Sequence, residues 1–270
     1  MHDAREKTDR RAQGAYWDAL SDEYARMTRI DETDFHYGPQ IPGESALRLL
    51  PPLGPGASAL EIGCGGAQNS VWLARRGVRC TALDISEGQL RHARALAARC
   101  GVAIDLRRAA FEDFGSVLPA GALFDLVHSS HALEFADDPE PVVRAMAARA
   151  KPGGTVVVST VHPVFNGEWI DGTFEDENGE PCGGETPGMF LESYFEPPDD
   201  VRDDACGHVV SRAWPVSAWF RWFAGAGLRV TALAEPPAVR DAPYTSDAWA
   251  DHGGELDKIP STLILVGEKT

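Results

Sequence analysis

The stretch Ala59-Leu60-Glu61-Ile62-Gly63-Cys64-Gly65-Gly66-Ala67 decides how the rest of the chain is organised. It is a short apolar run, interrupted by one acid, that breaks into a glycine-rich turn, and a helical pattern follows from about residue 68 to 76. Glycine lets a backbone turn sharply and approach a ligand closely, and the first turn of the next helix has free N–H groups. The stretch therefore predicts a strand, a loop and a helix that bind a nucleotide-like ligand.

Strands and helices alternate regularly after this point. The apolar patterns predict strands at 57–62, 79–83, 103–106, 124–129, 155–161, 228–234 and 261–266, and helices at 67–76, 87–100, 139–150 and 215–226. Such alternation is typical of an α/β fold in which helices cover both faces of a mostly parallel sheet. Because right-handed crossovers bring the carboxyl ends of parallel strands to one edge, we expect the ligand there.

Two segments do not follow this alternation. Apolar residues at helical spacing predict one or two helices in residues 1–30, and another helix is expected at 44–50, so we assign 1–56 as an N-terminal helical lid or cap. The remaining residues, 57–270, form the main domain. Within it, 162–212 is too long for an unstructured loop in a compact domain, and we expect a folded insertion such as a hairpin or cap. We predict that these two segments together build a pocket for a small-molecule substrate.

Composition excludes several classes of function. The 270-residue chain carries 25 basic and 41 acidic side chains, a formal net charge of −16, so most of its surface would repel nucleic acid. No apolar run approaches the roughly 20 residues that span a bilayer. The five cysteines form no CxxC pair, which favours reduced thiols in a cytoplasmic protein and predicts no metal site.

An acid after the second expected strand strengthens the nucleotide interpretation. The loop has Gly63 and Gly65, but Gln68 stands where a dinucleotide fingerprint has its third glycine. Asp84 follows Gly63 by 21 residues, and a carboxylate at that strand end can accept hydrogen bonds from both ribose hydroxyls of an adenosine. The alternative role is a helix N-cap formed by Asp84 or Ser86, and the two roles are compatible.

Four motifs in this order resemble the class I S-adenosylmethionine-dependent methyltransferases, and especially the methyltransferase type 11 group. The matching stretches are Glu61-Ile62-Gly63-Cys64-Gly65-Gly66, Leu83-Asp84-Ile85-Ser86, Phe124-Asp125-Leu126-Val127-His128-Ser129-Ser130 and Ala148-Arg149-Ala150-Lys151-Pro152-Gly153-Gly154. They cover about residues 57–160, and outside that span the resemblance is loose. It implies a Rossmann-like fold with a mostly parallel seven-stranded sheet and S-adenosylmethionine as cofactor.

The resemblance also implies roles for single residues. Glu61 would order the glycine loop and meet the methionine end of the cofactor, while Asp84 would hold the ribose and Ile85 would lie against the adenine. The full set of implied cofactor residues is Glu61, Gly63, Cys64, Gly65, Asp84, Ile85, Ala110, Phe111 and Ser129, with Tyr16 and Tyr24 as weaker candidates. Two positions depart from the family pattern. Ala109 replaces a frequent acid near the adenine, and Ala67 replaces a frequent glycine, although alanine suits the start of a helix.

Histidines at the expected ligand edge are candidates for a catalytic base. Methyl transfer needs a base only when the acceptor must lose a proton, and histidine suits that task near neutral pH. His162 and His131 rank first because they follow two of the expected central strands; His128, His36 and Tyr37 are weaker candidates. The alternative for each histidine is an ordinary buried or surface residue.

The sequence therefore favours transfer of a methyl group from S-adenosylmethionine to a small organic molecule in secondary metabolism. Oxygen is slightly favoured over nitrogen or carbon as the methylated atom. The main alternative is a cyclase or binding protein that keeps the fold and the cofactor without transferring methyl. A nicotinamide-dependent oxidoreductase shares the first strand, loop and helix, but it would have the third glycine that this loop lacks.

Overall fold

The sheet that carries the glycine loop is seen in a computed structural model of the chain, which describes residues 9–166, 168–170, 174–175, 178–182, 188–247, 256 and 258–270. Its seven strands lie in the order β13–β15–β6–β5–β2–β3–β4. They are β2 (Ser58–Ile62), β3 (Arg79–Asp84), β4 (Ile104–Arg108), β5 (Phe124–Ser130), β6 (Ala150–Val161), β13 (Leu228–Ala234) and β15 (Thr262–Lys269). Strands β2 to β6 pair in parallel, and β15 runs antiparallel to both of its neighbours. The expected seven-stranded, mostly parallel sheet is confirmed.

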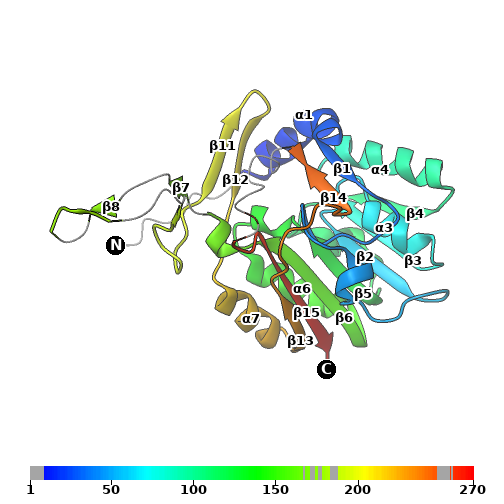
Figure 1. Ribbon diagram of the computed structural model, residues 1–270. Helices are drawn as coiled ribbons and strands as arrows, with labels where there is room; N and C mark the ends of the chain where they lie inside the picture. Colours follow the sequence, from blue (N-terminus) through cyan, green and yellow to red (C-terminus); the bar gives the residue numbers. More distant parts are fainter. Residues whose placement is uncertain are drawn as a thin grey trace.

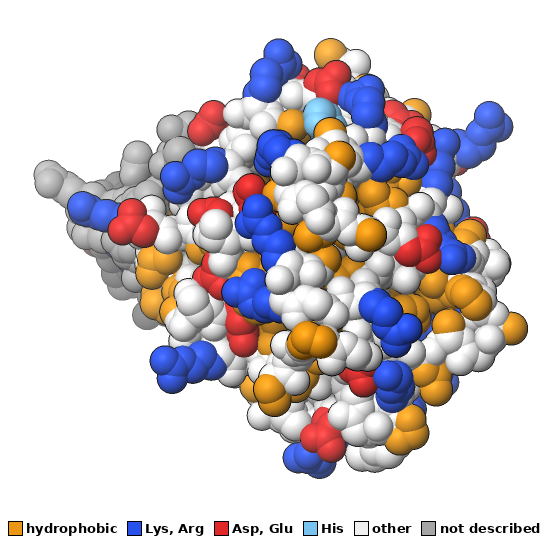
Figure 2. Space-filling model, turned by 90° about the vertical axis from the view of Figure 1, so that its right-hand side faces the viewer, with side chains coloured by type: hydrophobic (Ala, Val, Ile, Leu, Met, Phe, Trp, Pro, Cys, Tyr) orange, Lys and Arg blue, Asp and Glu red, His pale blue; other side chains and the backbone are white. Residues whose placement is uncertain are grey.

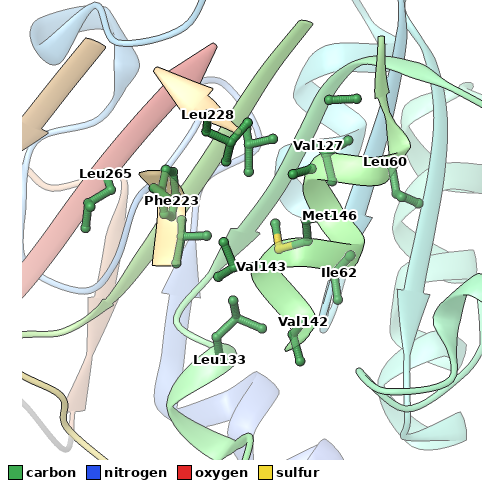
Figure 3. Close-up of a cluster of buried hydrophobic side chains, with 14 of the residues drawn as sticks. Leu60, Ile62, Val127, Leu133, Val142, Val143, Met146, Phe223, Leu228 and Leu265 are labelled. Carbon is green, nitrogen blue, oxygen red and sulfur yellow. The ribbon is translucent and has the colours of Figure 1, made fainter. Parts of the chain in front are cut away.

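Helices cover both faces of this sheet, as expected (Figure 1). One face packs against α5 (Phe114–Val117), α6 (Pro139–Arg149) and α7 (Val216–Gly225) through the cluster of apolar side chains drawn in Figure 3. In that cluster Met146 and Val143 of α6 and Phe223 of α7 lie against Val127 and Leu265 of the sheet. The other face packs against α3 (Gln68–Ala74), α4 (Glu87–Cys100) and the buried side chains of Phe35, Tyr37 and Ile41.

Two elements differ from their expected bounds for local reasons. The helix expected at 44–50 is shorter, α2 (Glu44–Leu47), because Arg48 takes the left-handed conformation at φ +52° and the Glu44 carboxylate accepts from the backbone N–H groups of Leu49 and Leu50. Strand β6 begins at Ala150, five residues before the expected start, because Ala150 pairs with Phe124 before the ladder shifts register.

The segments outside the sheet gather at the carboxyl ends of its parallel strands (Figure 1). They are α1 (Arg10–Met27), the antiparallel pair β1 (Thr28–Ile30) and β14 (Tyr244–Ser246), the short helix η1 (Leu133–Phe135), and the hairpin of β11 (Asp200–Asp204) and β12 (Gly207–Ser211). Helix α1 contacts both α4 and β12. The other described elements of the insertion are η2 (Pro163–Asn166), β7 (Glu168–Ile170) paired with β10 (Gly188–Phe190), and β8 (Phe174–Glu175) paired with β9 (Pro181–Cys182). The division of the chain at residue 56 stays a prediction.

The face over α3 and α4 carries many basic side chains despite the net negative charge (Figure 2). Several of them are neutralised by neighbouring carboxylates, as in the pairs Arg91–Asp22, Arg94–Glu87 and Arg107–Asp105. Over the described residues, no helix is long and apolar enough to cross a membrane, and no group of three or more His, Cys, Asp or Glu side chains is placed to hold a metal ion. The expected absence of nucleic-acid partners stays a prediction.

Candidate active site

Three residues of the glycine loop between β2 and α3 take left-handed backbone conformations, and only two of them are glycines. Gly63 and Gly65 take φ values of +69° and +50°, which favour glycine, and a Cβ on Gly63 would lie 2.3 Å from the Cβ of Ala132. Ala67, which caps α3, also has a left-handed φ of +58°. The expectation that alanine suits this position is therefore wrong, because a residue with a side chain is strained there and glycine is not.

Asp84, at the end of β3, holds this loop in place. Its carboxylate accepts from the backbone N–H of Gly65 at 2.8 Å and from that of Ser86 at 2.9 Å. Ser86 is the N-cap of α4, since its hydroxyl accepts from the N–H of Gln89. Burial is the largest cause that raises the pKa of Asp84, to about 6. The carboxylate keeps lone pairs for further donors, as the hydroxyls of a ribose would be.

Glu61 lies at the bottom of the loop and is almost completely buried. Its carboxylate accepts from the backbone N–H of Ser70 at 3.1 Å and from the Ser70 hydroxyl at 2.5 Å, both in the first turn of α3. Desolvation raises the pKa of Glu61 to about 8, and the charge of Asp84 adds to this effect. A cationic group bound beside it would reverse the shift.

A first cavity opens where the loop, β3 and β5 end. It is lined by residues of the loop and strand ends together with side chains of α1, residues 30–36 and β14: Gln13, Trp17, Tyr24, Ile30, His36, Glu61, Gly63, Cys64, Gly65, Gly66, Gln68, Asp84, Ile85, Gln89, Ala109, Phe111, Ser130, His131, Ala132, Phe135 and Tyr244. It thus combines backbone N–H groups, two carboxylates and apolar surfaces. Such a lining fits a nucleoside with a charged tail.

A second cavity adjoins the first on the side of α1 and the β11–β12 hairpin. Its lining is mainly aromatic and apolar, with a few charged side chains: Tyr16, Trp17, Leu20, Glu23, Tyr24, Met27, Thr28, Pro39, His131, Glu134, Phe135, Arg202, Asp204, Ala205, Cys206, Tyr244 and Ser246. Five residues line both cavities, namely Trp17, Tyr24, His131, Phe135 and Tyr244. We call these five residues the shared wall.

Comparison with known proteins agrees with this arrangement. Residues 60–158 match the family model of the methyltransferase domain. The ubiquinone biosynthesis O-methyltransferase of Chromobacterium violaceum is 38% identical over 107 residues, which are 40% of this chain and 45% of that protein. The chain thus spans less than half the length of the curated relatives it matches.

Solved structures extend the likeness to most of the chain. One, from Listeria monocytogenes, is described as an S-adenosylmethionine-dependent methyltransferase; it aligns with a TM-score of 0.64 at 19% identity and covers 83% of this chain and 95% of its own. The [4+2]-cyclase SpnF aligns with a TM-score of 0.60 at 16% identity and covers 97% of this chain and 96% of its own.

The decisive feature is that the stretch matched by the family model lies on this strand order and supplies most of the residues that line the first cavity. Residues 60–158 match a methyltransferase domain, and the sheet has the fold of the class I methyltransferases. The cofactor of that family is S-adenosylmethionine, and the residues present fit it. Asp84 would offer a carboxylate to the ribose, Ile85 and Phe111 would offer apolar surface to the adenine, and the buried carboxylate of Glu61 would be available to a charged tail, since all four residues line the cavity.

Most of the residues that the sequence predicts for the cofactor line the first cavity of the methyltransferase domain. Ala110 and Ser129 are outside its lining, where their neighbours Ala109 and Ser130 are found instead. The Ser129 hydroxyl donates to the carbonyl of Ile62 at 2.8 Å and so joins two strands. Of the weaker candidates, Tyr24 lines both cavities, and Tyr16 lines only the second.

His131 is the first-ranked histidine that the structure brings to the shared wall. Its Nδ1 lies 3.2 Å from Oε1 of Glu134, and its Nε2 lies 2.9 Å from the hydroxyl of Thr262. The backbone of His131 has a left-handed φ of +47°, and its ring leaves no room for a Cβ on Gly38. Such strain in a residue with a side chain is frequent at functional sites. We call the side chains of His131 and Glu134 the dyad.

The structure places the other first-ranked histidine and two weaker candidates outside both cavities. His162 is buried, contacts Glu235 through Nε2 at 2.7 Å and accepts from the N–H of Val164 through Nδ1. His128 packs against Phe35 on the α3 face of the sheet, and burial lowers its pKa to about 3. Tyr37 donates to Glu44 at 2.5 Å.

His36 is the only one of the weaker catalytic candidates among the described residues that lines the first cavity. Its side chain is buried, and its ring packs edge-to-face on Tyr244 with 5.2 Å between centroids. Burial lowers the pKa of His36 to about 3, and the nearby His131 adds to the shift. His36 is therefore a neutral imidazole near pH 7.

Helix α1 is fixed over the first cavity by polar contacts to elements on two sides of it. Asp18 accepts from the Ser86 hydroxyl at 2.7 Å and from the N–H of Gly88 at 2.9 Å, at the start of α4. On the other side Gln13 donates to the carbonyl of Phe135 at 2.9 Å, and Tyr16 donates to Asp204 at 3.0 Å. The helix thus connects the cofactor side of the site to the hairpin.

Sequence reasoning missed several residues of the shared wall and its surroundings. Tyr244 lies between the strands expected at 228–234 and 261–266, where the sequence predicts no element, and Trp17, Phe135 and Glu134 are not among the predicted site residues. A partial signal was available, because Trp17 and Tyr24 lie seven residues apart on the expected helix and thus on one face. No comparable signal marks Tyr244.

Proposed function

We propose that the protein transfers the methyl group of S-adenosylmethionine to an oxygen atom of a small organic acceptor. The observation that carries this proposal is the pair of adjoining cavities with a shared wall. One has the loop and carboxylates that suit the cofactor, and the other has an aromatic lining that suits a flat acceptor.

Binding and orientation are the main tasks of the protein in such a reaction. The cofactor supplies a methyl group already activated by its sulfonium, so positioning of the acceptor can provide much of the rate. Asp84 and Glu61 hold the two ends of the cofactor. Trp17 and Phe135, whose ring centroids lie 5.1 Å apart, exclude water from the boundary between the two cavities.

Oxygen is favoured as the acceptor atom by the dyad. A hydroxyl acceptor must lose its proton. If it replaces the Thr262 hydroxyl at Nε2 of His131, that nitrogen can take the proton while the Glu134 carboxylate beside Nδ1 stabilises the imidazolium that forms. The name of the Chromobacterium violaceum relative describes an O-methyltransferase as well, although that likeness lies in the cofactor half of the chain. An acceptor used in secondary metabolism, in the cytoplasm, remains our expectation.

The experiment that tests the cofactor part is a thermal-shift titration with S-adenosylhomocysteine. The wild-type protein should gain stability with ligand concentration. Asp84→Ala should weaken the affinity about 100-fold, because it removes the ribose contact and the brace of Gly65. The matched control is Asp105→Ala on the neighbouring strand, whose carboxylate contacts only Arg107 among the described residues. Equal affinities for the two variants would contradict the proposed cofactor site.

The transfer part is tested by release of S-adenosylhomocysteine with a panel of phenols. His131→Ala should lower turnover on the order of 100-fold, whereas His162→Ala should retain it. Unchanged turnover in His131→Ala would eliminate the histidine base. A bound cofactor with no transfer to any phenol would favour the non-transferring alternative.

A further inference from the structure

We propose that the hydroxyl pair of Tyr24 and Tyr244 selects and orients the acceptor by donating a hydrogen bond to an oxygen beside the methylated hydroxyl. This inference rests on the proposed function. Tyr24 belongs to α1 and Tyr244 to β14, 220 residues further along the chain, and their hydroxyl oxygens lie 2.5 Å apart. Both residues belong to the shared wall, so the pair lies where an acceptor in the second cavity must meet the cofactor in the first.

The backbone fixes this pair in place. Ile30 pairs with Tyr244 and Thr28 pairs with Ser246 in the short β1–β14 ladder, directly after α1 ends. The Thr28 hydroxyl donates to the carbonyl of Tyr24 at 2.7 Å and caps the last turn of α1. The ring of His36 packs on Tyr244 from the other side. Two hydroxyls held in this way keep their position when the acceptor enters, which is what an orienting contact requires.

A count of hydrogen atoms leaves one donor for a ligand. Two hydroxyls carry two hydrogens, and one of them lies in the bond between the two tyrosines. Among the described residues, neither hydroxyl has a further protein partner. One O–H therefore remains to donate to a ligand.

The surroundings of the two tyrosine hydroxyls keep both of them protonated. Burial raises the pKa of Tyr24, and the charges of Glu134 in the second cavity and Asp84 in the first both add to this shift. Burial also raises the pKa of Tyr244 well above its ordinary value. Both hydroxyls are thus neutral at pH 7, and the pair acts as a donor and not as a base.

The shared wall therefore presents two different polar groups to an acceptor. The dyad takes a proton, the tyrosine pair donates a hydrogen bond, and the rest of the wall is the aromatic surface of Trp17 and Phe135. A suitable acceptor is a flat, uncharged ring with a hydroxyl for the dyad and a neighbouring oxygen for the tyrosines. An apolar substituent at that place would leave a buried O–H without a partner, which is costly.

The test uses two probes that differ only in this oxygen, 2-methoxyphenol and 2-ethylphenol. Their affinities are measured by calorimetry with the protein saturated with S-adenosylhomocysteine. We expect 2-methoxyphenol to bind roughly tenfold more tightly than 2-ethylphenol, as one net hydrogen bond of this kind implies. The double variant Tyr24→Phe/Tyr244→Phe, which leaves no O–H at this place, should bring this ratio close to one, and the wild-type ratio tests the inference by itself if that variant fails to fold.

The control is Tyr194→Phe, whose hydroxyl accepts from the N–H of Val216 at 3.4 Å, outside both cavities. This variant should keep the wild-type ratio. Equal affinities of the two probes for the wild type, binding of neither probe, or an unchanged ratio in the double phenylalanine variant would overturn the inference. Failure of the wild type to bind S-adenosylhomocysteine would instead remove the proposed function itself, and this inference with it.

Discussion

The cofactor half and the acceptor half of this site are built in different ways. The cofactor half comes from consecutive strand–loop–helix units between residues 58 and 111, and its contacts are largely made by backbone groups and short-range carboxylates such as Asp84. The acceptor half combines α1, η1, the β11–β12 hairpin and β14, which are separated by up to about 220 residues. The family model matches residues 60–158, which contain most of the first half and little of the second. The part of the site that the family model covers is thus mainly the cofactor half.

The largest effect is expected when Arg212, on the side of the acceptor half, is replaced. Its guanidinium is almost completely buried and contacts Asp137 at 2.8 Å and Asp199 at 3.1 Å, while its backbone N–H donates to the carbonyl of Glu134 at 2.7 Å. It therefore joins the base of the hairpin to the turn that carries Glu134. Arg212→Met should lower the free energy of unfolding by about 3 kcal/mol, because it leaves two carboxylates without this partner.

Urea denaturation measures that loss, and Arg229→Met, which removes a surface pair with Glu268, should cost less than about 1 kcal/mol. If the halves are separate, Arg212→Met should weaken binding of phenol probes far more than binding of S-adenosylhomocysteine. An equal loss of both affinities would show that the two halves behave as one unit.

The pH dependence of stability is the next test, and it concerns the cofactor half. The pKa of Glu61 is raised to about 8, so the folded protein binds a proton that the unfolded chain releases near its ordinary value of 4.5. Stability of the ligand-free protein should therefore fall as pH rises through this window, by on the order of 2 kcal/mol between pH 6 and 8.

Glu61→Gln should flatten this fall, measured by denaturation at a series of pH values. The control Glu140→Gln removes a surface carboxylate of α6 that contacts Arg144, and it should leave the slope as in the wild type. A slope that persists in Glu61→Gln would show that another group causes it.

Ala67→Gly should give the smallest effect. The left-handed φ of Ala67 costs on the order of 1 kcal/mol, and glycine adopts this conformation without strain, so the variant should be more stable by up to that amount. Ala95→Gly, in the exposed interior of α4, should instead lose about 1 kcal/mol. A loss of stability in both variants would mean that the loop is not strained at Ala67.

The sequence was informative wherever a local rule applied. Strand β13 and helix α4 have the expected bounds, because the signals that set them act within a few residues. Both elements show a periodic apolar pattern, and α4 also has the N-cap serine Ser86 and a glycine after its last turn. Asp84 was found for the same reason, since its position after a strand and its spacing from the glycine loop are properties of consecutive units. His128 shows the limit of such reasoning. It follows the same strand pattern, but the alternation of side chains turns it to the α3 face, against Phe35.

The amino-acid sequence by itself thus determined the sheet and the glycine loop, because these depend on backbone conformation and periodicity over short distances, and the resemblance of its motifs to a known family indicated the class of cofactor. The tertiary structure alone decided which side chains meet at the shared wall. The contact between Tyr24 and Tyr244, the dyad against Thr262 and the burial of Arg212 all join segments far apart in the chain. Such contacts depend on how whole elements pack against one another, and no local pattern of residues encodes them.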